Sequence, residues 1–234
     1  MEKKLGVKNY EDILERLDEL EEKFDFVLNL GAHHKEAEVL DPTPSIDIEE
    51  RIEVEIKPSA YLKMALHAIK YANADIPKED WVEVIGLMTG KIENAGTPLE
   101  LITVNDYWAI GTGDAVSVNI LNAEPVMDVY KNKPKNDFIV GWAHSHPSYT
   151  PFLSQDDINT QSRYQALWED SIAVVIDPTM ITKFNPGHSI FRLTETRDVY
   201  YEVKTKIGGM SASAAYEALN LLLKEKGIKA EQFN

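Results

Sequence analysis

Two histidines separated by one residue, His144 and His146, lie close in the sequence to Ser154 and Asp157. If the histidines end an extended strand, their side chains point to the same face and can bind one ion from one side. Asp157, in the first turn of a helix that follows, could supply a carboxylate to the same ion. Two histidines and one carboxylate leave the fourth position of a tetrahedral zinc open, which is the arrangement of a catalytic zinc site.

Each of these residues also has a purely structural interpretation. Ser154 and Asp157 have the Ser-x-x-acid spacing of a capping box and would stabilise a helix that begins there. The two histidines could be core residues with satisfied hydrogen bonds. A capping serine and a metal-binding aspartate are compatible on one helical turn, so both interpretations stay open.

A hydrolytic zinc site also needs a base for its water, and Glu83 is the best candidate. It precedes VIGLMTG and alternates in phase with Ile85 and Leu87, on the apolar side of an expected strand. Partial burial there would raise the pKa of its carboxyl toward the range that is useful for proton transfer. The alternative is that Glu83 simply faces solvent where the strand begins.

Other catalytic groupings are absent from the sequence. The chain has no cysteine, which excludes disulfides, cysteine nucleophiles and the thiolate zinc ligands of deaminase-type sites. It also lacks the HExxH, GxSxG and P-loop motifs. His33 and His34 are adjacent and would face opposite ways on a strand, and His67 lies alone on an expected helix, so none of them is assigned a role. The glycine-rich residues 111–115 are interpreted as a flexible loop.

The elements around these residues are predicted to form one mixed sheet flanked by helices, an α/β fold of the α+β type. Ser59 is expected to cap the first helix of this domain, Gly227 to follow the last, and Pro147 to end the histidine strand. Alternation and apolar runs predict strands over 51–56, 81–93, 99–110, 137–146, 171–178 and 189–194, and helical spacing predicts helices over 59–73, 155–170 and 211–227.

Composition separates an N-terminal extension from the rest of the chain. Residues 1–57 hold 17 acidic and 8 basic side chains. Within them, residues 10–24 are predicted to form an amphipathic helix that either docks to a partner or lies on its own domain, and residues 37–50 a linker with prolines. We therefore expect an extension over 1–50 and a catalytic domain over 51–234.

Charge and hydropathy exclude several function classes. The net charge of −15 argues against nucleic-acid binding, and either suits a basic partner or serves only solubility. No apolar run is long enough to span a membrane, and the N-terminus lacks the apolar core of a secretory signal. We therefore expect no membrane association and a cytoplasmic location.

The combination of Glu83 in EVIGLMTG, the HSHP segment, and the serine and aspartate at this spacing resembles the signature of the JAMM (MPN-plus) metalloisopeptidases. The stretches LSQDDINTQ and AVVIDP are similar to those of the deubiquitinating members of this family in the proteasome lid. The resemblance covers roughly residues 51–227. Pro151 and Phe152 depart from it, because the eukaryotic lid enzymes have cysteine and tryptophan there.

The resemblance implies an MPN/JAMM (cytidine-deaminase-like) fold and a role for each site residue. His144, His146 and Asp157 would bind Zn²⁺. Glu83 would be the base that takes a proton from the attacking water and passes it to the leaving amine. Ser154 would donate a hydrogen bond to the oxyanion of the tetrahedral intermediate.

The resemblance also implies the substrate, the bond after the C-terminal glycine of ubiquitin or a ubiquitin-like modifier. Residues from about Gly111 to Lys135 resemble the loop that pairs with this extended tail, so Gly111, Thr112 and Gly113 are the expected substrate-binding residues. An MPN-domain partner or a proteasome-like complex is also expected. The alternatives are a metal-free MPN scaffold, whose known members lack the intact residue set, and a hydrolase of an unrelated small amide.

Overall fold

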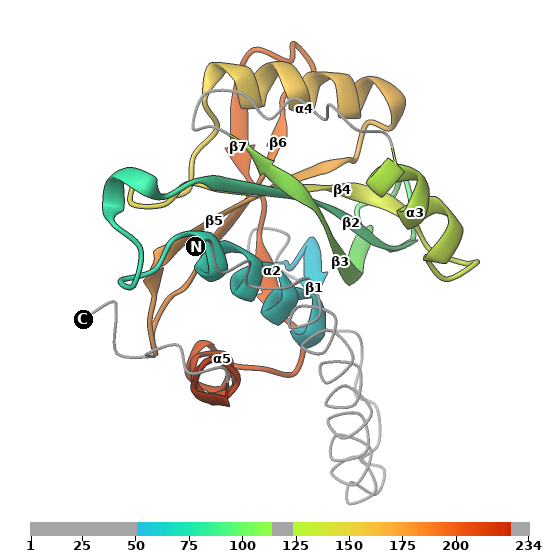
Figure 1. Cartoon of the computed structure of the whole chain (residues 1–234). Coiled ribbons are helices and arrows are strands. Elements are labelled where there is room, and N and C mark those ends of the chain that lie inside the picture. The colour runs from blue at the N-terminus through green and yellow to red at the C-terminus, as the bar shows by residue number, and fades with distance from the viewer. Residues whose placement is uncertain (1–50, 114–123, 226–234) are drawn as a thin grey trace, which may run out of the picture. The chain divides into compact units, whose positions relative to one another are not determined.

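The computed structural model describes residues 51–113 and 124–225, and the architecture reported below concerns these residues. They form an eight-stranded sheet with helices on both faces (Figure 1). The elements in chain order are β1 (Val54–Ile56), α2 (Pro58–Tyr71), the 3₁₀-helix η2 (Lys78–Asp80), β2 (Glu83–Glu93), β3 (Leu101–Gly113), α3 (Glu124–Asn132), β4 (Phe138–Ser145), α4 (Gln155–Leu167), β5 (Ile172–Ile181), β6 (Pro186–Leu193), β7 (Tyr200–Glu202), β8 (Thr205–Ile207) and α5 (Ala212–Glu225).

The sheet is mixed, with the strand order β7-β6-β5-β4-β2-β3-β1-β8. β4 lies in its interior, antiparallel to β2 and parallel to β5. Ile85 of β2 stands opposite His144 of β4, which in turn stands opposite Val175 of β5. This arrangement of strands and helices confirms the predicted α+β class and places the histidine strand between two long neighbours.

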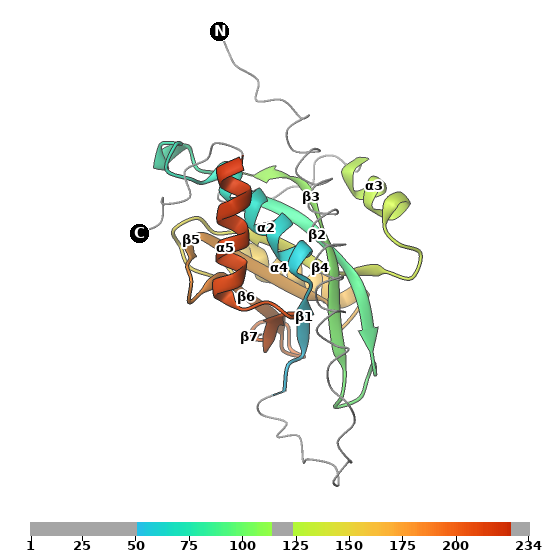
Figure 2. The same cartoon turned by 90° about the horizontal axis from the view of Figure 1, so that it is seen from below.

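Helices cover both faces of the sheet, α4 on one and α2 with α5 on the other (Figures 1 and 2). The core on the α4 side contains Ile85 and Leu87 from β2, together with Trp142 from β4. Val84 and Val174, which have the opposite phase on their strands, are also buried. Because side chains alternate along each strand, the phase of a residue decides which helical layer it meets. None of the helices in the described ranges has an apolar stretch sufficient to cross a lipid bilayer.

Close contact between β4 and β5 depends on Gly141. A Cβ atom at this position would lie 2.1 Å from the carbonyl oxygen of Ile172, which is far inside van der Waals contact. Glycine therefore lets β5 approach β4 just before the histidines, and a larger residue would force the two strands apart.

Most predicted elements are confirmed, and two local interpretations are wrong. Ser59 does not cap α2, because the helix begins at Pro58 after Lys57 and the cap position makes no side-chain hydrogen bond. Residues 111–113 are not a loop, because they continue β3 and pair with β2. The helix α3 was not predicted at all. The predicted features within residues 1–50 and at 114–115, and Gly227, lie outside the described residues, so the boundary at residue 50 stays a prediction.

Candidate metal centre

The carboxyl end of β4 places both histidines on the α4 side of the sheet. The strand ends directly before His146, whose N–H donates to the Ile176 carbonyl of β5 at 2.9 Å. The His144 ring stacks on Trp142 with centroids 4.6 Å apart, and the His146 ring packs against Phe152 at 4.7 Å. Both imidazoles are buried, so these ring contacts restrict their positions.

The first turn of α4 brings the aspartate to the histidines. Ser154 is the N-cap, and its backbone N–H and Oγ both donate to Asp157 Oδ2, at 2.8 and 2.6 Å. The Asp157 N–H donates back to Ser154 Oγ at 3.2 Å, which completes a capping box. The structural interpretation of these two residues is therefore confirmed. It does not exclude a second role, because Asp157 also faces the histidines.

The potential ligand atoms of His144, His146 and Asp157 all lie within 4.8 Å of one another. The two Nε2 atoms are 3.0 Å apart, His144 Nε2 is 3.2 Å from Asp157 Oδ1, and His146 Nε2 is 3.4 Å from Oδ2. Bonds of about 2.0–2.1 Å to a tetrahedral zinc would place neighbouring ligand atoms about 3.3 Å apart. The three residues, which we call the histidine–aspartate cluster, therefore fit a zinc ion.

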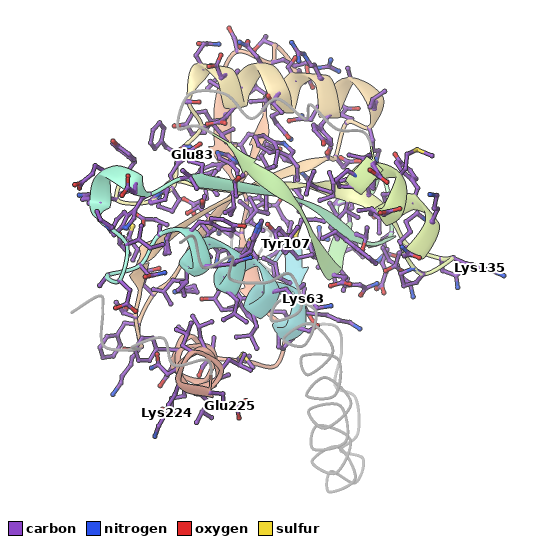
Figure 3. All side chains as sticks on the ribbon, in the orientation of Figure 1. Lys63, Glu83, Tyr107, Lys135, Lys224 and Glu225 are labelled. Atoms are coloured by element: carbon purple, nitrogen blue, oxygen red, sulfur yellow. The ribbon has the colours of Figure 1, made fainter. Side chains whose placement is uncertain are left out.

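Glu83 lies beside this cluster at the start of β2. Its Oε1 is 3.8 Å from His146 Nε2. Burial raises the pKa of the Glu83 carboxyl to about 7; His146 opposes this shift and Asp157 adds to it. Figure 3 shows Glu83 between the sheet and α4, at the end of the sheet opposite Lys135. The prediction that Glu83 shares the buried phase of Ile85 and Leu87 is confirmed, so it is not a solvent-facing residue.

The charges in the histidine–aspartate cluster follow from burial and hydrogen bonding. Burial lowers the pKa of His144, although Asp157 opposes this. Burial by itself would raise the pKa of Asp157. Hydrogen bonds from both histidines and Ser154 outweigh this effect and hold the pKa well below its usual range. A neutral imidazole beside an ionised carboxylate is the protonation state that metal binding requires.

Ser145, between the two histidines, faces away from them and has its own contact. Its Oγ accepts a hydrogen bond from the Val84 N–H at 3.0 Å, and the side chain is fully buried. This bond continues the pairing of β2 with β4 one residue beyond the last backbone pair, Ile85 with His144. It fixes the backbone next to Glu83. This contact could not be predicted from the sequence, because a bond between distant strands leaves no local pattern.

A buried glutamine fixes α4 against the strand that carries the histidines. Gln161 Oε1 accepts from the Trp142 indole at 2.8 Å, and its Nε2 donates to Ser171 O at 2.6 Å and to Gln165 Oε1 at 3.0 Å. Gln161 is not among the residues singled out from the sequence. A signal was available, because Gln161 follows Asp157 by one helical turn and so shares its face.

The residues expected to bind substrate lie next to Glu83 on the neighbouring strand. Gly113 stands opposite Glu83, Thr112 opposite Val84, and Gly111 opposite Ile85. They thus extend β3 as far as the candidate base. Their role in substrate binding stays a prediction.

The chain matches the model of a known protein family and is similar to several known proteins. The model described as "JAB1/Mov34/MPN/PAD-1 ubiquitin protease" matches residues 50–170. "26S proteasome non-ATPase regulatory subunit 14" of Drosophila melanogaster is 35% identical over 170 residues, covering 72% of this chain and 52% of that protein. The subunit of the same name from Dictyostelium discoideum is 32% identical over 171 residues, covering 71% and 51%.

A Saccharomyces cerevisiae protein is also similar to this chain. "Ubiquitin carboxyl-terminal hydrolase RPN11" is 35% identical over 147 residues, which cover 61% of this chain and 44% of that protein. The chain therefore spans about half the length of the curated relatives it matches. The family model covers Glu83 and the whole histidine–aspartate cluster.

Proposed function

The chain belongs to the JAB1/Mov34/MPN/PAD-1 family, and on this premise we propose that it is a zinc-dependent deubiquitinase. It would hydrolyse the isopeptide or peptide bond after the C-terminal glycine of ubiquitin or a ubiquitin-like modifier. The observation that carries the proposal is the approach of His144, His146 and Asp157 to one another, with Glu83 beside them. The names of the relatives support the ubiquitin substrate.

His144, His146 and Asp157 would hold the metal. When bound, Zn²⁺ supplies Lewis acidity to a substrate carbonyl and lowers the pKa of a coordinated water to about 7. The chain contributes two imidazoles and one carboxylate, and the buried Trp142 ring stacks on His144. No nucleophilic side chain is needed, which agrees with the lack of cysteine in the sequence.

Glu83 is the proposed proton carrier. With its pKa raised to about 7, its carboxylate can accept a proton from water and return it near neutral pH. Water adds to the amide carbon, the C–N bond breaks, and the proton held by Glu83 passes to the leaving lysine amine. The products are the free carboxylate of the modifier and the free amine, so the reaction balances without a co-reactant.

Ser154 is the proposed donor to the oxyanion. Its single hydroxyl hydrogen points to Asp157 Oδ2 at 2.6 Å. To stabilise an oxyanion, the hydroxyl would rotate this hydrogen toward the substrate, while the backbone N–H of Ser154 keeps its bond to the same oxygen. The cap would thus persist during catalysis.

The substrate tail and the partners complete the proposal. Gly111, Thr112 and Gly113 extend β3 beside Glu83, where an extended glycine-rich tail could approach the base. An MPN-domain partner or a proteasome-like complex is proposed from the names of the relatives. The cytoplasmic location, and the separation of residues 1–50 as an extension, stay predictions.

Cleavage of ubiquitin fused through its C-terminal glycine to a reporter tests the proposal. The wild-type chain should release the reporter, a chelator should stop the release, and added zinc should restore it. Glu83→Gln should keep the metal and the fold but slow turnover by about 10²–10⁴-fold, because general-base catalysis contributes that much. A folded wild-type chain that binds the fusion without cleaving it, with zinc present, would instead support the scaffold alternative.

A further inference from the structure

The connection between β4 and α4, residues 147–153, carries none of the proposed zinc ligands, yet it separates His146 from the helix that presents Asp157. Its backbone is unusual. Ser148 has a φ of 70° and Thr150 a φ of 63°. Residues with side chains rarely adopt this left-handed region, and they persist in it where surrounding contacts hold them. Some group outside the connection must therefore stabilise this conformation.

The carboxylate of Asp177 is that group. Its Oδ1 accepts from the Ser148 N–H at 3.1 Å, and its Oδ2 accepts from the Thr150 N–H at 3.1 Å. Oδ1 also accepts from the N–H and the Oγ1 of Thr179, at 2.9 and 2.7 Å. Asp177 is 1% exposed. One buried carboxylate thus satisfies the backbone of both left-handed residues at once.

Asp177 also occupies a position that links it to the histidines. It follows Ile176 on β5, whose carbonyl accepts from the His146 N–H at 2.9 Å. Two consecutive residues of β5 therefore hold the end of the histidine strand and the start of the connection. The AVVIDP stretch, to which Asp177 belongs, has no part in the chemistry proposed above.

We propose that Asp177 is a positioning residue of the metal site, which sets the location of Asp157 relative to His144 and His146 by holding the connection in its left-handed form. This inference rests on the proposed function, because it takes the histidine–aspartate cluster as a zinc site. Asp177 itself touches neither the metal nor the substrate.

Other contacts hold α4 independently of Asp177. Leu153, just before the helix, is 4% exposed within the core, and Gln161 bonds to Trp142 farther along α4. Loss of Asp177 should therefore loosen the first turn of α4 without detaching the helix. The effect should be larger on metal binding than on folding, which distinguishes positioning from a general structural role.

The test compares three full-length variants: Asp177→Ala, Asp177→Asn and Asp137→Ala. Asp137 is a matched control, because it is a buried carboxylate at the opposite end of β4 that accepts from Asn105 Nδ2 at 2.9 Å. The readouts are zinc affinity by competition with a chelating dye, the visible absorption of the cobalt-substituted chain, and the melting temperature.

Asp177→Ala should weaken zinc binding by about 10–100-fold, the loss found when a group that orients a metal ligand is removed. Its cobalt spectrum should change, because the geometry around the ion changes. Asp177→Asn should fall between wild type and alanine, since an amide oxygen can still accept from Ser148 while its NH₂ opposes the Thr150 N–H. Asp137→Ala should lower the melting temperature but leave zinc affinity and the cobalt spectrum unchanged.

The asparagine variant keeps the test decisive if the alanine variant does not fold. Wild-type zinc affinity and an unchanged cobalt spectrum in Asp177→Asn and in any folded Asp177→Ala would overturn the inference, whatever the melting temperatures. Failure of the proposed function looks different, because the wild-type chain would then bind zinc without cleaving the ubiquitin fusion. A wild-type chain that binds no zinc would overturn both.

Discussion

Two groups of buried polar side chains lie on opposite faces of the sheet, and they are completed in different ways. On the α2 side, Lys63 Nζ donates to Asp106 at 2.9 Å, and His67 Nδ1 pairs with the Tyr107 hydroxyl at 2.7 Å. We call these four residues the α2 cluster; Figure 3 labels two of them, Lys63 and Tyr107. In it, every side chain finds a complementary partner within the protein.

The histidine–aspartate cluster on the α4 side is also buried, but not all of its polar atoms have a partner among the described residues. The Nε2 atoms of His144 and His146 face each other at 3.0 Å, and within the described part of the chain neither Nδ1 has a hydrogen-bond partner. His67, at 4% exposed, is as inaccessible as His146, at 5%. Burial alone therefore does not distinguish the two groups of side chains, which differ in how their polar atoms are paired within the protein.

The largest effect should follow from changing the carboxylate of the histidine–aspartate cluster. Asp157→Asn keeps the shape and part of the cap but replaces an anionic ligand by a neutral amide, so zinc affinity and turnover should both be lost. Metal content and cleavage of the ubiquitin fusion measure this. An Asp157→Asn variant with full zinc content and turnover would contradict the proposal that the histidine–aspartate cluster, unlike the α2 cluster, is a metal site.

A smaller effect should separate the two roles of Ser154. Ser154→Ala should slow turnover by about 10²–10³-fold through loss of an oxyanion donor, with zinc content near that of wild type. Loss of the cap alone would cost only about 1 kcal/mol of stability. Turnover and melting temperature are measured on the same preparation, and an unchanged rate with a lowered melting temperature would leave Ser154 as a cap only.

The smallest effect concerns the α2 cluster and should appear in stability, not in turnover. Burial lowers the pKa of His67 from 6.5 to about 3, and Lys70 adds to the shift. Between these pH values the unfolded chain binds more protons than the folded chain. The contribution of neutral, buried His67 to the free energy of unfolding is therefore fully present above about pH 6.5 and is lost as the pH falls. From pH 7 to pH 5, His67 should account for about 2 kcal/mol of this loss.

Urea unfolding at the two pH values measures this dependence, with His67→Leu as the control. The variant should be less stable at pH 7, because it loses the bond to Tyr107, but its stability should fall less steeply toward pH 5. Equal slopes for the two chains would mean that His67 is not held neutral by burial.

The ease of prediction also differs between parts of the molecule. The strand of His144 and His146 and the capped start of α4 follow from side-chain alternation and residue spacing, which are local. Ser59 shows where a local rule fails, because Pro58 at the first helical position makes Lys57 the N-cap. The local rule also fails at Gly111–Gly113. Their glycines indicated a flexible loop, but pairing with β2 makes them part of β3.

The contacts that support the site could not be predicted from local patterns. Ser145 with Val84, and Asp177 with Ser148 and Thr150, join segments that are distant in the sequence. Such bonds depend on strand register, which appears only in the folded chain. Resemblance to a family indicated the proposed catalytic residues, but not the residues that hold them in place.

X-ray absorption at the zinc edge of the wild-type chain tests the central claim most directly. The histidine–aspartate cluster predicts one zinc per chain, with nitrogen and oxygen ligands at about 2.0–2.1 Å and the outer-shell scattering of two imidazoles. Zinc bound without imidazole scattering, or a folded chain that binds no zinc, would contradict the account.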